Sequence, residues 1–155
     1  MTPTPEAIAA FVQQVQEWQI QYSDEMVCPV TGLVVPKTLE ANVKWRQDIR
    51  RQCRENPALR AAVRAACKRS FIYWCNLMCF TFHQKWVDDA GIEIAVTGEA
   101  CHVPFITWKI QDDAALKIIE CIEKGEDVLI DKSRDMGASW MVAAIFPWLW
   151  QFRAN

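Results

Sequence analysis

The fold prediction starts from residues 128–140, which read Val128-Leu129-Ile130-Asp131-Lys132-Ser133-Arg134-Asp135-Met136-Gly137-Ala138-Ser139-Trp140. The first three residues are wholly apolar, which is typical of a buried parallel β-strand. A polar turn containing Gly137 follows. The apolar run over residues 140–152 then predicts a helix that bends at Pro147. Strand, loop and helix in this order favour an α/β fold with a phosphate-binding loop.

The loop matches the common phosphate-binding pattern GxxxxGK[ST] only in part. Gly137 stands at the second glycine and Ser139 at the hydroxyl position, but Lys132 replaces the first glycine and Ala138 the usual lysine. The chemistry requires a close backbone approach, a hydroxyl for Mg²⁺ and a cation for the phosphates. Gly137 and Ser139 can provide the first two. Lys132, with Arg134 as a second cation, can provide the third, and an ordinary strand-to-helix turn is the alternative.

Helix start signals are spread through the first half of the chain. Threonine or asparagine followed by an apolar periodic run, often with proline at the first helical position, predicts an N-terminus. Such signals predict helices that begin near Pro5, Thr38 and Pro57, and the aromatic run from Phe71 predicts a buried helix that ends near Phe82. Residues 23–37 are rich in turn formers and predict a loop or a short hairpin.

The second half predicts strands as well as helices. Strict alternation over residues 92–96 predicts a half-buried strand, and residues 103–110 are the candidate partner. Asp112 and Asp113 open the next helix, which ends at Gly125.

The charge is unevenly distributed along the chain. Seventeen basic and nineteen acidic residues give a net charge of −2, yet residues 41–70 hold nine basic and two acidic side chains. This basic block can lie on a DNA phosphate backbone. A solvated helix surface or an acidic protein partner is the alternative.

The seven cysteines and the absence of a secretion signal favour reduced thiols in a cytoplasm-like compartment. Cys75, Cys79 and His83 share a face of the predicted helix and form a candidate metal site, although burial as small core residues is the favoured interpretation. The longest near-apolar run, residues 71–82, is too short to span a bilayer, so no membrane partner is expected.

Residues 131–140 resemble the variant Walker A loop of large terminase subunits, the DNA-packaging motor ATPases of tailed bacteriophages. Many of these proteins place the loop lysine at the start of the loop, as Lys132 is placed here. The segment Pro104-Phe105-Ile106-Thr107-Trp108-Lys109-Ile110-Gln111 is similar to the family's adenine-binding segment, which ends in a glutamine. The aromatic stretch over residues 71–76, followed by Thr81, is similar to the preceding segment, but the proline usual after that threonine is missing. The resemblance covers residues 69–150.

This resemblance implies ATP and Mg²⁺ as cofactors. Gln111 would hydrogen-bond the adenine edge, and Phe105 or Trp108 would line the base site. The phosphates would be held by Lys132, Ser133, Arg134, Gly137, Ala138 and Ser139, and Ser139 would also hold the metal. Five tryptophans would build the adenine pocket and the core, namely Trp74, Trp108, Trp140, Trp148 and Trp150.

The hydrolytic half of such a site is missing from the sequence. No apolar strand ending in Asp-Glu follows Ser139, and the family's coupling motif and nuclease are also missing. We therefore expect an N-terminal fragment that does not hydrolyse ATP alone. A truncated or frameshifted prophage gene, one piece of a split gene, and a partial record are the alternatives. Residues 128–130 would be a central strand without neighbours, so apolar side chains such as Phe146 would lack the sheet they pack on.

The predicted organisation is a helical region with the basic block, residues 1–70, and the start of a P-loop NTPase domain, residues 71–155. That domain would be a doubly wound parallel sheet left incomplete in this chain.

The implied role is ATP binding for translocation of viral DNA into the procapsid, in the bacterial host cytoplasm and transiently at the procapsid portal. The implied partners are double-stranded DNA, the small terminase subunit, the portal protein and further copies of the chain. The alternatives are a small helical DNA- or protein-binding module without ATP chemistry, and an unrelated P-loop ATPase such as a helicase fragment.

Overall fold

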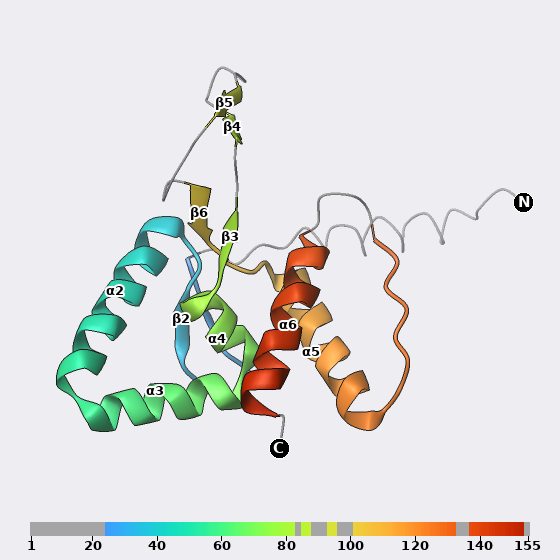
Figure 1. The fold of residues 1–155 in the computed structure, drawn as a ribbon, viewed down its shortest axis with the longest axis horizontal. Coiled ribbons are helices and arrows are strands. Elements are labelled where there is room, and N and C mark those ends of the chain that lie inside the picture. The colour runs from blue at the N-terminus through green and yellow to red at the C-terminus, as the bar shows by residue number, and fades with distance from the viewer. Residues whose placement is uncertain (1–23, 83–84, 88–92, 96–100, 133–136, 154–155) are drawn as a thin grey trace, which may run out of the picture.

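The structure is a computed structural model of the 155-residue chain. It describes residues 24–82, 85–87, 93–95, 101–132 and 137–153 (Figure 1). In chain order the elements are β1 (Glu25–Val27), β2 (Val34–Pro36), α2 (Leu39–Glu55), α3 (Pro57–Arg69), α4 (Phe71–Met78), β3 (Phe80–Phe82), β4 (Lys85–Val87), β5 (Glu93–Ala95), β6 (His102–Pro104), α5 (Lys109–Lys124) and α6 (Ala138–Phe152).

The predicted doubly wound parallel sheet is wrong. The described residues form a mainly helical fold with three separate two-stranded sheets, β1–β2, β3–β6 and β4–β5, and all three are antiparallel. Residues 128–130 form a coil rather than a strand, and Leu129 is 96% exposed. The physical reason is that a strand needs a partner to satisfy its backbone, and no strand of the described chain pairs with this segment.

The hairpin prediction for residues 23–37 is confirmed from residue 24 onward. β1 and β2 pair with Met26 opposite Val35, and Gly32 closes the turn at a φ of 72°. Met26, Cys28 and Val35 are buried. The hairpin therefore contributes its apolar side chains to the same core as the helices.

The helices of the basic block begin where the sequence predicts. α2 follows Thr38, and α3 follows Asn56, whose Oδ1 accepts a hydrogen bond from the N–H of Leu59 at 3.0 Å. The two helices meet at a corner, and α4 contacts both of them (Figure 1). The helix predicted near residues 5–21 lies outside the described residues.

α4 is shorter than predicted. It begins at Phe71, where the Ser70 hydroxyl accepts from the N–H of Tyr73, and it ends at Met78 because Phe80–Phe82 leaves as strand β3. β3 pairs with β6, while β5 pairs with β4, so the predicted pairing between residues 92–96 and 103–110 is wrong. An alternating pattern can indicate that a segment is a strand, but it does not indicate which other strand it pairs with.

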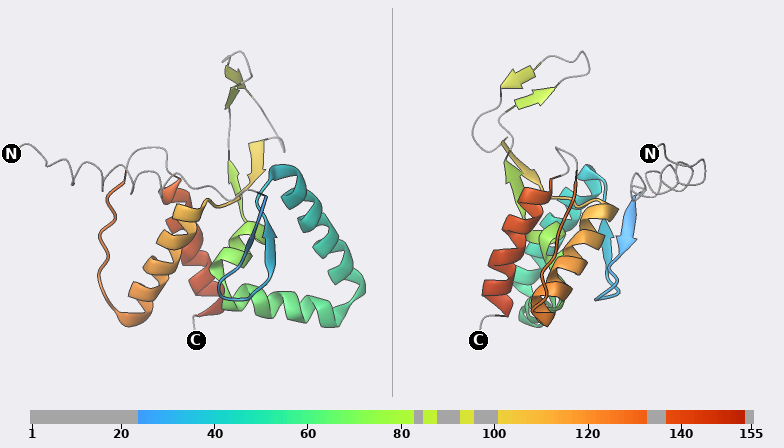
Figure 2. Two further views of the ribbon diagram at one scale, coloured as in Figure 1. Left: turned by 180° about the vertical axis from the view of Figure 1, so that it is seen from behind. Right: turned by 90° about the vertical axis from the view of Figure 1, so that its right-hand side faces the viewer.

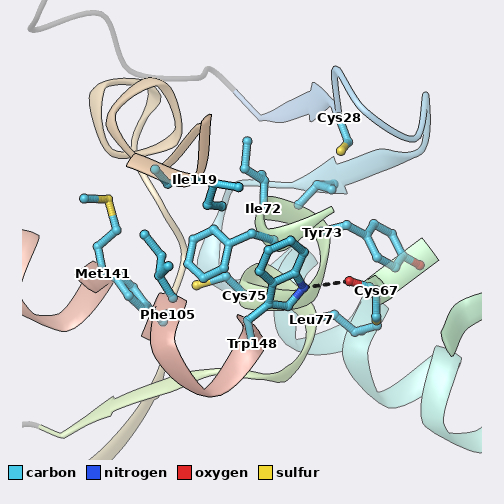
Figure 3. Packing of buried hydrophobic residues seen from close by; sticks show 14 of the residues in the cluster. Cys28, Cys67, Ile72, Tyr73, Cys75, Leu77, Phe105, Ile119, Met141 and Trp148 are labelled. Carbon is cyan, nitrogen blue, oxygen red and sulfur yellow. Dashed lines mark hydrogen bonds between the residues drawn. The ribbon is translucent and has the colours of Figure 1, made fainter. Parts of the chain in front are cut away.

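The core surrounds α4 and joins elements from both sides of residue 70. The rings of Phe71 and Trp148 meet edge to face with centroids 5.9 Å apart, and the Trp148 Nε1–H donates to the Cys67 carbonyl at 2.8 Å (Figure 3). α6 runs beside both α4 and α5 in the two views of Figure 2. Ile145 and Trp148 are thus buried against helices instead of a parallel sheet, while Phe146 is 63% exposed.

None of the helices in the described part of the chain combines the length and apolar character needed to cross a bilayer.

Candidate functional site

The N-terminus of α6 lies at the centre of the candidate site. Gly137 precedes the helix with a φ of 65° and a ψ of 8°, and its carbonyl accepts the hydrogen bond from the N–H of Met141. Ala138 and Ser139 form the first turn. The first N–H groups of a helix have no partner within it and lie at the positive end of its dipole, so this end can receive an anion.

Gln111 packs directly against this helix start. It lies in the first turn of α5, is 7% exposed, and its Oε1 accepts from the backbone N–H of Trp108 at 2.9 Å. A Cβ at residue 137 would lie 2.6 Å from the Gln111 Nε2. Glycine is therefore favoured at 137 by the left-handed backbone, and a side chain there would also displace the carboxamide that faces it.

A buried ion pair holds the segment that carries Gln111. Lys37 Nζ, from the end of the hairpin, lies 3.1 Å from Asp112 Oδ2, and each side chain is only 3% exposed. Lys37 also donates to the Thr107 carbonyl and to Asn76 Oδ1, and Thr107 Oγ1 donates to Asp112. Burial lowers the pKa of Lys37, while the Asp112 carboxylate opposes that shift. The network fixes residues 107–112 against α4, and with them the position of Gln111.

A pocket of about 260 Å³ opens beside Gln111 and Gly137. Two half-exposed indoles, Trp108 and Trp140, flank it. Its remaining lining residues are Thr81, Val103, Pro104, Phe105 and Ile106. Aromatic walls with one carboxamide suit a flat heterocycle that has hydrogen-bonding edges.

A second, larger hollow of about 540 Å³ lies along α6. Lys132 and Ser139 are its polar side chains, and Ile130, Ala138, Val142, Ala143 and Phe146 complete the lining. A further cavity of about 200 Å³ is lined by Gln111, Lys132 and Ala138 among others. The structure thus brings the predicted base residue next to predicted phosphate residues from the loop.

Two of the predicted phosphate ligands, Ser133 and Arg134, lie outside the described residues. Phe105 lines the pocket beside Gln111 and Gly137, but it is 6% exposed and also belongs to the core. Sequence reasoning missed Thr81 as a pocket residue and missed Lys37 altogether. Thr81 reaches the pocket through the pairing of β3 with β6, and a lysine after a hairpin carries no signal of burial.

The candidate metal site of Cys75, Cys79 and His83 gains no support. Cys75 is fully buried in the core, where burial raises the pKa of its thiol well above the ordinary value. Its hydrogen bond with Cys79 lowers the pKa of the Cys79 thiol. His83 lies outside the described residues, and within the described ranges no group of three or more His, Cys, Asp or Glu side chains could hold a metal ion.

The basic block is exposed on α2 and α3 with one exception. Arg46 is 3% exposed, donates from Nε to Asn42 Oδ1 and from Nη1 to the Cys79 carbonyl, and stacks over the ring of Phe80. Burial lowers the pKa of its guanidinium to about 10. Arg46 therefore ties α2 to the start of β3, whereas the other basic residues remain on the surface.

Comparison of the chain with models of known protein families, with curated proteins and with solved structures gave no match.

Proposed function

We propose that the chain binds ATP at the N-terminus of α6, as the N-terminal portion of a phage terminase large subunit. The observation that supports this most is the packing of the Gln111 carboxamide against Gly137. Gln111 lines both the pocket flanked by Trp108 and Trp140 and the smaller cavity that Lys132 and Ala138 also line.

The adenine would occupy the tryptophan-flanked pocket. A glutamine carboxamide offers one acceptor and two donor hydrogens, which match the amino group and ring nitrogen on one edge of adenine. The bond from the Trp108 N–H engages Gln111 Oε1 and sets the orientation of the amide plane. The indoles of Trp108 and Trp140 would stack on the base.

The phosphates would lie at the helix start. Backbone N–H groups at a helix N-terminus bind anions, and Gly137 has no Cβ to block their approach. Lys132 would supply the cation. Ser139 is exposed in the first turn of α6 and would offer one hydroxyl oxygen to Mg²⁺, with the phosphates as the other ligands.

The packaging role rests on the resemblance of residues 69–150 alone. It implies double-stranded DNA, the small terminase subunit, the portal protein and further copies as partners. It also predicts that the gene lies beside genes for a small terminase subunit, a portal and a capsid protein. Neighbouring genes of unrelated function would refute the packaging role but would not affect the proposal of an ATP site.

The ATP site is tested by titrating the full chain with a fluorescent ATP analogue. Gln111→Glu keeps the acceptor for the Trp108 N–H and removes the amide donor, so we expect at least about tenfold weaker binding, or about 1.4 kcal/mol. Lys132→Ala should weaken binding by a similar factor. Gln151→Glu and Lys124→Ala make the same chemical changes at the far ends of α6 and α5 and should leave binding unchanged.

Equal affinities for wild type, Gln111→Glu and Lys132→Ala would refute the site. So would a similar loss in the two control variants, because it would show that the analogue responds to charge and not to this pocket.

A further inference from the structure

A groove lies between α2, α3, α4 and the C-terminal end of α6, the opposite end of that helix from Gly137. Its volume is about 260 Å³. We call it the arginine groove, and its lining residues are Ile49, Arg50, Cys53, Arg60, Val63, Arg64, Cys67, Trp74, Leu77, Met78, Gln151 and Phe152.

Three arginines rim this groove. Arg60 and Arg64 lie four residues apart on α3, so they share one face of the helix, and Arg50 approaches from α2. All three side chains are exposed, and none forms an ion pair among the described residues. No acidic side chain lines the groove. The rim is therefore a concentration of positive charge that the described chain does not neutralise.

The floor of the groove is apolar. Val63 stands between the two arginines of α3, Leu77 and Cys67 are buried beneath, and Trp74 and Phe152 are partly buried at its walls. Met78 is a large apolar side chain at the edge and is 50% exposed. An apolar floor enclosed by arginines is unusual for a merely solvated helix surface, whose apolar stripe would be covered.

We propose that the arginine groove binds an acidic amphipathic helix of a partner protein. The apolar face of such a helix would fill the floor, and its carboxylates would pair with Arg50, Arg60 and Arg64. Arginine suits this role because its planar guanidinium can donate two parallel hydrogen bonds to one carboxylate. A helix laid in an apolar groove is a common form of peptide recognition.

The lining of the groove favours a protein helix over DNA. A phosphate backbone would engage the arginines but would leave the exposed parts of Val63 and Met78 without an apolar partner. DNA-binding surfaces gain affinity from phosphate contacts and do not need an apolar floor. A ligand whose acidic side chains flank an apolar face matches both the charge on the rim and the apolar floor between the arginines.

The test uses the full chain and a fluorescein-labelled helical peptide with leucine and phenylalanine along one face and glutamate on both flanks of that face. Fluorescence anisotropy measures binding. We expect saturable binding by this peptide and none by a peptide with lysine in place of glutamate. Arg60→Gln combined with Arg64→Gln should weaken binding by about tenfold, because two charge-assisted pairs are lost. Met78→Glu should weaken it by a similar factor, because it places a carboxylate at the edge of the floor.

The matched control is Arg54→Gln combined with Lys68→Gln, which removes two exposed charges from the same two helices outside the groove. It should leave peptide binding within about twofold. The Arg60 and Arg64 double variant should unfold in urea with the midpoint of the wild type, which shows that the variant is folded whether or not the chain binds ATP.

Several outcomes would overturn the proposal. No saturable binding up to about 1 mM peptide would do so. An equal loss of peptide affinity in both double variants would show that the peptide is attracted by the overall positive charge and does not bind in the groove. A short DNA duplex that binds more tightly than the peptide, with the same dependence on Arg60 and Arg64, would assign the groove to nucleic acid. A dimer that the same variants dissociate would assign it to a second copy of the chain.

Discussion

Substitution of Gly137 by alanine separates the local role of this residue from its role in the candidate site. Gly137 and Gly125 have almost the same left-handed backbone, with φ values of 65° and 70°. An L-residue pays about 1–2 kcal/mol in this conformation, so Gly137→Ala and Gly125→Ala share that loss of stability. Gly125 ends α5 and has no atom within 4 Å of a built Cβ. It is therefore the matched control.

The second effect is confined to Gly137→Ala. The new Cβ would lie 2.6 Å from Gln111 Nε2, which forces the carboxamide to move. Movement would weaken the bond from the Trp108 N–H to Gln111 Oε1, which contributes about 0.5–1.5 kcal/mol. We expect total losses of about 1.5–3.5 kcal/mol for Gly137→Ala and about 1–2 kcal/mol for Gly125→Ala. We also expect at least about tenfold weaker binding of the ATP analogue for Gly137→Ala alone.

Urea denaturation of each variant measures the stability difference, and titration with the ATP analogue measures the binding difference. In a Gln111→Ala background the clash is gone, so Gly137→Ala should then cost no more than Gly125→Ala. The reasoning is refuted if the two glycine variants lose equal stability in the wild-type background and bind the analogue equally. It is also refuted if Gly137→Ala remains as costly after Gln111 is truncated.

Three further predictions concern the core that supports the site. Lys37→Met leaves the Asp112 carboxylate buried without its cation and should destabilise the chain by about 3–5 kcal/mol in urea, and most of this should return when Asp112→Asn is added. Trp148→Phe removes the hydrogen bond to the Cys67 carbonyl and should cost about 1–3 kcal/mol by the same measurement. Burial raises the pKa of Tyr73 and that of Cys67 to about 12 from ordinary values of 10.0 and 9.0. The folded chain thus retains these protons while the unfolded chain releases them, so the stability contributed by each group is lost as the pH rises towards 12, and Tyr73→Phe should make that decline shallower.

Each of these three predictions would be contradicted by a specific result. A double variant at Lys37 and Asp112 no more stable than Lys37→Met would show that the ion pair is not the source of the loss. If Trp148→Phe is as stable as the wild type, the hydrogen bond from Trp148 to the Cys67 carbonyl contributes little to stability. An unchanged pH dependence in Tyr73→Phe would show that this phenol does not titrate differently in the two states.

The parts of the fold that were predictable depend on local chemistry. Asn56 followed by Pro57 predicts the start of α3 because the asparagine side chain caps the first turn whatever surrounds it. Gly125 predicts the end of α5 because it adopts the left-handed conformation that closes a helix. The hairpin over residues 24–37 follows from its turn residues in the same way.

The predictions that the structure contradicts concern contacts between residues far apart in the sequence. Residues 128–130 have the composition of a buried strand, but pairing with another strand decides whether such a run becomes one, and none of the described strands pairs with it. α4 stops at Met78 because Phe80–Phe82 pairs with residues some twenty positions away, which no window of sequence shows. Ile145 and Trp148 of α6 pack on helices and not on a parallel sheet, and the sequence could not show this because an apolar helix face does not specify its partner.

For the candidate site, the sequence by itself determined the residue types. The chemistry of Lys132, Gly137 and Ser139 suits the phosphates of a nucleotide, while Gln111 was predicted only through the resemblance of residues 104–111 to the terminase adenine-binding segment. Only the tertiary structure decided that the Gln111 carboxamide packs on Gly137, that Lys37 is buried against Asp112 to hold it there, and that the arginines of α2 and α3 surround an apolar groove. Such juxtapositions join residues tens of positions apart, and they are set by how the helices pack around α4 and not by any local pattern.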